Sequence, residues 1–247
     1  MPSTRTRLRR SGGRSGLPEA PPLVVAIDGP SASGKTTVGR LLARALGLPL
    51  VDSGLMYRAV TVLAAEAGID VDDAAGLTRL AESSDIEVNP STDEGLDWEV
   101  RAGQVDLTSQ VFDQRLTAML TRVSQVPGVR QVLVRRQRAY GEGGVVMLGR
   151  DIGTVVFPDA DVKVFLTATE AERRRRRAVQ MKDHDPATLK GEIDDRDTAD
   201  STRSVAPLRP AEDALTIDTD GRSAESVFHE ILRLIPSTRR RRAIAEA

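Results

Sequence analysis

Five short apolar runs recur along the chain, separated by segments with the spacing of helices. The runs show no alternation of apolar and polar residues, which is typical of strands buried on both faces of a parallel sheet. They are Leu23–Asp28, Leu50–Asp52, Val145–Leu148, Val162–Leu166 and Ala214–Asp218. Helical periodicity marks Tyr57–Ala67, Asp113–Gln125, Val129–Tyr140, Glu170–Met181 and Ser223–Leu234. We expect an α/β fold in which helices wrap a five-stranded parallel sheet.

One section has a different pattern. Between Ile86 and Thr108, apolar and polar residues alternate in short stretches with turn residues between them. This alternation predicts a small antiparallel β insert at about residues 86–109. An insert that follows the second helix would lie over the edge of the sheet where ligands bind. It could therefore act as a binding lobe. A purely structural embellishment explains the pattern almost as well.

Composition narrows the class of protein. The 247 residues are 40% hydrophobic and 29% charged with a formal net charge of -1, which suits one substantial core and gives no global attraction to nucleic acid or membrane. The absence of cysteine excludes disulfides and thiolate metal sites and fits a reducing compartment. No apolar run approaches the length of a membrane span. These features fit a cytoplasmic protein, and we also expect it to be a monomer.

Basic segments flank the predicted domain. Residues 1–22 and 237–247 are rich in arginine and are expected to be disordered tails, with the folded domain at 23–236. The leader could act as an organelle transit peptide, although a solvated extension fits better. Arg239–Arg242 could form a nucleic-acid patch, but no aromatic residues are interleaved with them, so no nucleic-acid partner is expected.

The clearest chemical motif is the segment Gly29–Thr36, which matches G-x-x-x-x-G-K-[ST] between the first apolar run and the amphipathic stretch Val38–Leu46. In this context, backbone N–H groups and a helix N-terminus receive phosphate oxygens, and the lysine adds positive charge. The motif predicts ATP and Mg²⁺, with Thr36 as metal ligand and Thr37 as the alternative hydroxyl. The predicted ATP-binding residues are Gly29, Pro30, Ser31, Ala32, Ser33, Gly34, Lys35, Thr36 and Thr37.

Two details qualify this motif. Ala32 stands where such loops commonly have glycine, a change that is tolerable if its φ is negative. A regulatory GTPase would need an Asn-Lys-x-Asp base reader, and the only asparagine is Asn89, in the wrong setting. The motif therefore indicates a P-loop enzyme of another kind.

Three further segments resemble the bacterial cytidylate kinases, and the resemblance runs from about Leu23 to Leu234. Asp52–Arg58 is similar to their D-[ST]-G-x-x-Y-R, and Gly149–Ala160 to their G-R-D-x-G-T-V-V-F-P-D-A. Arg196–Leu208 is similar to their R-D-x-x-D-[S]-x-R-[AS]-V-[AS]-P-L. The resemblance implies direct transfer of the γ-phosphoryl group of ATP to CMP or dCMP, with a nucleotide-binding insert and a lid at about residues 170–200.

The resemblance also implies roles for individual residues. Arginines clamp the acceptor phosphate, an Arg–Asp pair reads the cytosine, and other polar groups hold the ribose. Such a pair complements the N4 donor and the N3 and O2 acceptors of cytosine and opposes uracil. The implied substrate-binding residues are Ser53, Arg58, Thr121, Arg130, Arg150, Asp151, Arg196, Asp200 and Arg203, and the catalytic ones are Lys35, Arg150 and Arg203.

Departures from the family pattern leave alternatives open. Leu148 stands where the family usually has an acid that can hold Mg²⁺-bound water, so this task could be weakened or move to Asp28 or Asp52. Phe112 stands where an arginine usually follows the insert. The alternatives are a P-loop kinase for UMP or another small acceptor, and a nucleotide-binding protein with impaired catalysis.

Overall fold

The computed structural model describes residues 21–91, 97–180, 198, 200–203 and 205–237. The two predicted tails lie almost wholly outside the described residues, as does Arg196 with most of the second half of the predicted lid.

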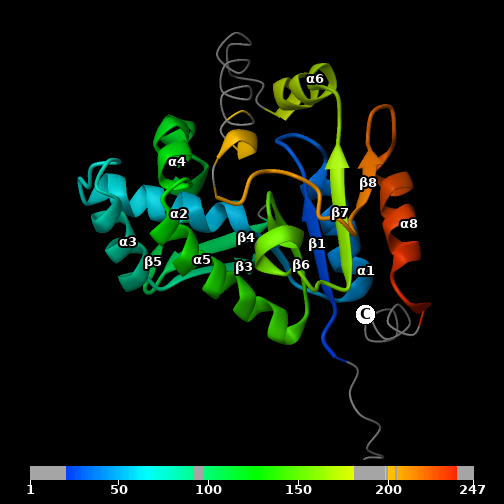
Figure 1. Ribbon diagram of the computed structural model, residues 1–247, viewed down its shortest axis with the longest axis horizontal. Coiled ribbons are helices and arrows are strands. Elements are labelled where there is room, and N and C mark those ends of the chain that lie inside the picture. Colours follow the sequence, from blue (N-terminus) through cyan, green and yellow to red (C-terminus); the bar gives the residue numbers. More distant parts are fainter. Residues whose placement is uncertain (1–20, 92–96, 181–197, 199, 204, 238–247) are drawn as a thin grey trace, which may run out of the picture.

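A five-stranded parallel sheet forms the centre of the fold, as predicted (Figure 1). Its order is β2-β6-β1-β7-β8, and each neighbouring pair is parallel. The strands are β1 (Val24–Asp28), β2 (Leu50–Asp52), β6 (Val145–Gly149), β7 (Val162–Thr167) and β8 (Leu215–Asp218). Because all five run the same way, their carboxyl ends share one edge of the sheet, where ligands of such folds bind.

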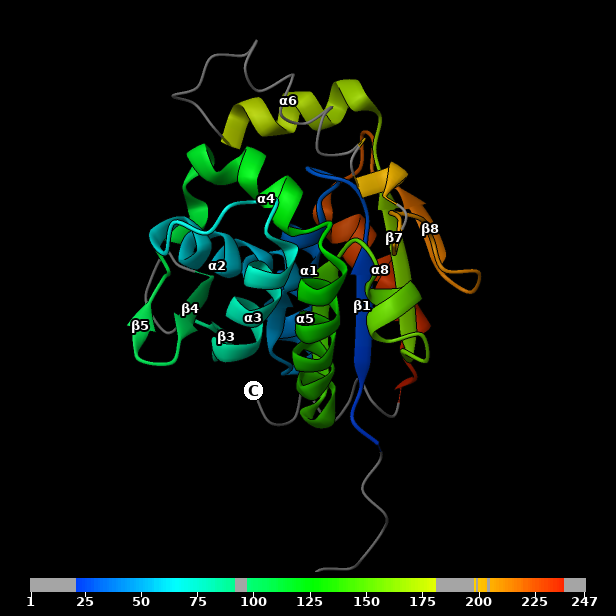
Figure 2. The same cartoon turned by 60° about the vertical axis from the view of Figure 1, so that its left-hand side comes forward.

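Helices cover both faces of this sheet (Figures 1 and 2). The helices α1 and α8 pack against each other, and α3 packs against α5. The bounds are α1 (Lys35–Leu46), α2 (Ser53–Glu66), α3 (Ala74–Ser83), α4 (Thr117–Val123), α5 (Pro127–Ala139), α6 (Glu170–Gln180) and α8 (Ala224–Leu234). Within the described part of the chain, none of the helices is long and apolar enough to cross a membrane.

The insert is the predicted antiparallel sheet. It contains β3 (Ile86–Pro90), β4 (Trp98–Ala102) and β5 (Val105–Asp106), with antiparallel pairing throughout. Trp98 joins it to the main sheet, since its Nε1 donates a hydrogen bond to the backbone oxygen of Leu50 at 2.9 Å. Asp97 joins it to α1 through a bidentate ion pair with Arg40. The insert is therefore fixed to the helix that follows the P-loop.

The helical predictions were partly wrong. The helix α3 was not predicted, and the predicted helix Asp113–Gln125 is in fact a 3₁₀ turn (Gln114–Leu116) followed by the seven-residue α4. The side chain of Asp113 accepts a hydrogen bond from the backbone N–H of Arg115 at 2.9 Å. Such a local side-chain turn competes with the regular helix at this point.

Candidate active site

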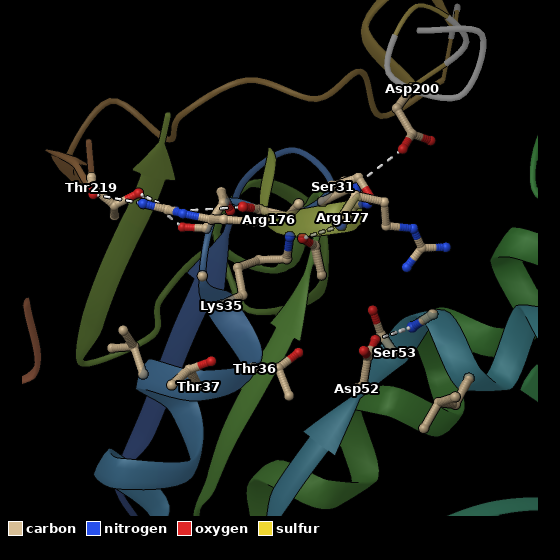
Figure 3. Close-up of a pocket in the computed structure, with 18 of the residues that line it drawn as sticks. Ser31, Lys35, Thr36, Thr37, Asp52, Ser53, Arg176, Arg177, Asp200 and Thr219 are labelled. Carbon is tan, nitrogen blue, oxygen red and sulfur yellow. Dashed lines mark hydrogen bonds and ion pairs between the residues drawn. The ribbon is translucent and has the colours of Figure 1, made fainter. Parts of the chain in front are cut away.

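A cavity of about 600 Å³ opens at the carboxyl edge of the sheet. It is lined by the P-loop, the start of α2, the loop after β6, the helix α6 and the start of α8. Figure 3 shows Lys35, Thr36 and Thr37 on one side of this space, facing Asp52 and Ser53. The cavity thus joins the motif predicted to bind ATP with segments predicted to bind the acceptor.

The side chain of Lys35 folds back over the P-loop and contacts its backbone. Lys35 Nζ donates hydrogen bonds to the backbone oxygens of Gly29 and Pro30 at 2.8 and 2.7 Å. Of the nine predicted ATP-binding residues, these two do not line the cavity and instead hold the lysine, whereas Ser31–Thr37 line it. Ser33 Oγ is buried with no hydrogen-bond partner among the described residues, which suits a loop built to receive phosphate oxygens.

Ala32 does not meet the condition set from sequence. Its φ is 58°, in the left-handed region, and not negative. The loop turns sharply here and continues into Gly34 with φ 99°, and this backbone path forces a positive φ on Ala32 although alanine prefers a negative one. This conformation costs an L-residue roughly 1–2 kcal/mol.

The predicted base-reading residues form a buried cluster. Arg130 and Asp151 make an ion pair, and their side chains are 4% and 8% exposed. The guanidinium of Arg130 also lies 5.4 Å from the ring centre of Tyr57, whose pKa is raised by burial to about 12. An ion pair buried in this way has both partners held in place, so it can present polar groups at fixed positions.

Arginines predicted to clamp phosphate extend the cluster. Arg150 Nε donates to Asp200 Oδ2 at 2.9 Å, and Arg203 lies 3.4 Å from the other oxygen of Asp200. Arg203 Nη2 is buried, 3.7 Å from Asp151, and makes no hydrogen bond to any described residue. Burial, followed by the charge of Arg130, lowers the pKa of Arg203. The cluster therefore contains a guanidinium donor that an anionic ligand would satisfy.

The remaining predicted acceptor residues line the same cavity. Arg58 donates to the backbone oxygen of Val111 at 2.9 Å, and its pKa is lowered mainly by burial, against the opposing effect of Asp52. Ser53 is the first residue of α2. Thr121 Oγ1 donates to the backbone oxygen of Thr117 at 3.1 Å. All three contribute to the wall of the cavity.

Some cavity residues were missed as individual site residues. Arg176 reaches from α6 to Thr219, with Nη1 to Oγ1 at 2.9 Å and Nη2 to the backbone oxygen at 2.8 Å (Figure 3). Glu172 accepts from Arg175 and Arg176, and this lowers its pKa to about 2. The family resemblance implied a lid at about residues 170–200, but it gave no signal for which of its arginines faces the cavity. Trp98, Phe112 and Ser124 also line the cavity.

The residues considered for metal binding differ in position. Leu148 is fully buried and does not line the cavity. Asp28 also lies outside the lining, and both of its oxygens accept backbone N–H groups. Asp52 and Thr36 line the cavity. Oxygen donors of this kind fit Mg²⁺, which keeps several waters and binds through substrate phosphates, and the described residues contain no cluster of three metal-binding side chains.

Comparisons with known proteins agree with this arrangement. The model of the family described as cytidylate kinase matches residues 25–237. A bifunctional pantoate ligase/cytidylate kinase of Synechococcus elongatus is 46% identical over 218 residues, covering 85% of this chain and 41% of the relative. A protein of the same name from a Nostoc species is 43% identical, covering 85% of this chain and 40% of the relative. The chain thus spans about two-fifths of the length of these curated relatives.

Among solved structures, a gluconokinase from Sinorhizobium meliloti is 16% identical with a TM-score of 0.40, covering 87% of this chain and 91% of that one. The family match extends over nearly all of the described residues and includes both the P-loop and the buried arginine cluster. This chain belongs to the cytidylate kinase family.

Proposed function

We propose that this chain transfers the γ-phosphoryl group of ATP to CMP or dCMP, giving ADP and CDP or dCDP. The observation that carries the proposal is the buried Arg130–Asp151 pair beside Arg203, whose Nη2 has no hydrogen-bond partner among the described residues. This cluster shares one cavity with the P-loop. Membership of the cytidylate kinase family supports the same reading.

The Arg130–Asp151 pair supports selection of the base. A carboxylate at Asp151 can accept from the N4 amino group of cytosine, and the guanidinium of Arg130 can donate to N3 and O2. Uracil presents O4 and N3–H at those positions. The carboxylate of Asp151 would then face another acceptor and the guanidinium of Arg130 another donor, both buried. We therefore propose that this pair favours CMP over UMP, with Thr121 at the edge of the same pocket.

The arginines support binding of the acceptor phosphate. Arg58, Arg150 and Arg203 each line the cavity, and the planar fork of arginine matches phosphate oxygens in a bidentate way. The acceptor phosphate is largely dianionic near neutral pH, so it needs no general base to act as nucleophile. Asp200 orients Arg150 and Arg203, and the family resemblance assigns it to the ribose as well.

Lys35 and the P-loop supply the donor side. The N–H groups of the loop and the charge of Lys35 would stabilise negative charge on the transferring group, so catalysis rests on positioning and charge neutralisation. Mg²⁺, when bound, neutralises charge on the ATP phosphates. Thr36 would hold it and Asp52 would orient its waters. A cytoplasmic location and a monomeric state stay predictions.

ADP formation measured with CMP, dCMP, UMP, AMP and no acceptor tests the proposal. We expect turnover with CMP or dCMP to exceed turnover with UMP by orders of magnitude, because a polar pocket rejects a mismatched base strongly. Asp151→Asn should reduce that preference. A preference for UMP or another acceptor would favour a different small-molecule kinase, and nucleotide binding without turnover would favour a protein with impaired catalysis.

Lys35→Met identifies the source of the activity in the same assay. We expect a loss of roughly a hundredfold or more in kcat, because a preorganised electrostatic donor is removed. Arg44→Met, in the last turn of the same helix and exposed to solvent, is the matched control and should retain wild-type turnover. Near wild-type activity of a folded Lys35→Met variant would contradict the assignment of the P-loop.

A further inference from the structure

Asp28 occupies a junction between the two halves of the site. It is the last residue of β1, and Gly29, the first residue of the P-loop motif, follows it directly. In the sheet it pairs with Gly149 at the end of β6 and with Phe165 of β7. Its side chain is 5% exposed and lies outside the cavity lining. Asp28 is thus a buried acid to which the proposed reaction assigns no chemical step.

The carboxylate of Asp28 holds the loop that follows β6. Oδ1 accepts the backbone N–H of Ile152 and Oδ2 that of Gly153, each at 2.8 Å. These two residues directly follow Arg150 and Asp151, the proposed phosphate and base contacts. They also open a single π-helical turn, Ile152–Val156, whose first backbone N–H groups have no partner within the turn.

The burial of this acid has an energetic cost. Desolvation, partly offset by the hydrogen bonds from Gly153 and Ile152, raises the pKa of Asp28 to about 6. At neutral pH the side chain is therefore mostly ionised although it is buried. A residue selected for stability alone would avoid such a charge, since replacing a buried charge by a neutral group of similar shape often stabilises a protein.

We propose that Asp28 is a positioning residue that sets the distance and angle between the donor and acceptor sites. Its backbone continues into the loop that holds ATP, and its side chain holds the loop that presents Arg150 and Asp151. This inference rests on the proposed phosphotransfer function. In-line transfer requires near-attack geometry, and a displacement of about 1 Å can cost on the order of a hundredfold in rate.

A metal-binding role for Asp28 is disfavoured by the same contacts. Both oxygens already accept N–H groups, and the residue does not reach the cavity. Asp28 acts through the backbone of the loop 150–153, so it is distinct from the groups that touch substrate.

Asp28→Asn is the main test. Its kinetics are compared with those of wild type, using whichever of CMP, dCMP, UMP and AMP gives the fastest turnover. The amide keeps one acceptor oxygen but places an NH₂ group against the second backbone N–H, so the loop should shift. We expect kcat to fall about tenfold to a hundredfold and the KM for the acceptor to rise. ATP binding should change less than about threefold, because a point-charge loss outside the cavity leaves the P-loop contacts in place. The fluorescence of Trp98, the only tryptophan in the sequence and a cavity residue, reports that binding.

Asp161→Asn is the matched control for this substitution. Asp161 accepts the backbone N–H of Val24 at 2.9 Å, at the opposite end of the same strand. It should leave kcat and both KM values unchanged even if it lowers the melting temperature. A loss of kcat equal to that of Asp28→Asn would show that general loosening of β1 explains the effect, and would overturn the proposal.

A second pair of variants covers the case in which Asp28→Asn does not fold. A Cβ added at Gly153 would lie in ordinary contact with Asp28 Oδ2 at 3.5 Å but closer to Lys163 Cδ at 3.3 Å, so in Gly153→Ala the loop or the lysine must shift slightly beside the same carboxylate contact. Gly143→Ala, where a Cβ meets nothing within 4 Å, is its control. We expect only Gly153→Ala to lower kcat with ATP binding intact.

The outcomes separate the two proposals. Turnover of wild type with an acceptor other than CMP or dCMP would overturn the proposed function, and the role of Asp28 would still be read on that acceptor. Wild-type kcat in folded Asp28→Asn and Gly153→Ala, or an equal loss of ATP and acceptor binding, would overturn the positioning role alone. If wild type transfers phosphate to no acceptor, both proposals fail.

Discussion

At Ala32 the P-loop backbone takes a conformation that alanine adopts only at a cost. With φ at 58°, replacement by glycine relieves the steric penalty but gives the unfolded chain more freedom. We expect Ala32→Gly to raise the free energy of unfolding by about 0.5–1 kcal/mol. Urea unfolding measures this change. Ala45→Gly, inside α1, should lower the free energy by a similar amount, and a loss of stability in both variants would contradict the strain at Ala32.

Asp28 should make stability depend on pH in a predictable direction. Its pKa in the folded chain is about 6, against 3.8 for the free group, so the folded state binds more protons between these values. We expect the free energy of unfolding to fall as pH rises from about 4 to 7, by about 2 kcal/mol for this group. Asp151 opposes ionisation of Asp28 and Lys35 favours it, and both are present in wild type and variant.

Comparison of wild type with Asp28→Asn isolates this contribution, because other titrating groups largely cancel. We expect Asp28→Asn to have the lower free energy of unfolding at pH 4, and we expect its deficit relative to wild type to shrink as pH rises to 7. Denaturant unfolding at several pH values gives the difference. A difference that stays constant across this range would show that the carboxyl group does not titrate in the window.

The positions of Leu148 and Asp28 show why sequence reasoning stopped short of the whole site. The family resemblance implied that Arg130, Asp151 and Arg203 belong to one substrate site, and the structure brings their side chains together, while their roles stay predictions. A strand buried on both faces has no alternation, so the direction of Leu148 could not be read. The role of Asp28 depends on backbone N–H groups, which every residue except proline has.

At the scale of elements, the hydrophobic pattern predicted the strands and helices wherever only one kind of element fitted it. Buried runs predicted all five parallel strands, and alternation predicted the insert. The helix α3 is short, and its signals are the N-cap residue Asp73, whose side chain accepts the N–H of Gly76, and two apolar residues, Leu77 and Ala81, which are buried in the structure. Those signals are present in the sequence, but a ten-residue helix with small residues gives a weak periodic pattern.

The attachment of the insert to α1 gives a prediction at this scale. Arg40 and Asp97 are 37% and 34% exposed, so their pair should contribute only about 0.2–1 kcal/mol to stability. Asp97 nevertheless precedes Trp98 in the cavity wall. We expect Asp97→Lys to raise the KM for the acceptor several-fold, by about the factor that 1 kcal/mol represents, with little change in kcat.

Adding Arg40→Glu to Asp97→Lys reverses both charges and should restore the KM. Steady-state kinetics of the two single variants and the double variant complete the cycle. If the double variant is no better than Asp97→Lys alone, the ion pair does not couple the insert to the acceptor site.

In the whole molecule, the site lies at the carboxyl edge of the sheet, whereas the core fills the space between the sheet and its helices, and Leu148 belongs to that core. A Cβ at Gly39 would lie 2.7 Å from its Cδ2, so this side chain fills the space between β6 and α1. We expect Leu148→Asp to cost about 3 kcal/mol or more, through lost packing and an unpaired buried charge. Leu148→Met should cost less than about 1.5 kcal/mol. Unfolding measurements compare the two, and equal stability of both would place residue 148 in solvent.

We therefore expect metal positioning to depend on a carboxylate that does line the cavity, and Asp52 lines it together with Thr36 (Figure 3). Asp52→Asn removes the charge but keeps a side-chain oxygen for the N-cap bond to Gly54, which Asp52 Oδ1 makes at 2.9 Å. We expect it to raise the Mg²⁺ concentration for half-maximal rate about tenfold or more, as loss of an outer-shell partner commonly does. Mg²⁺ titration at saturating ATP and acceptor measures this concentration.

Asp73→Asn is the control. It changes a comparable N-cap at α3, outside the cavity lining, and should leave the Mg²⁺ requirement unchanged. An unchanged requirement in a stably folded Asp52→Asn variant would mean that Thr36 and the substrate phosphates position the metal without this carboxylate.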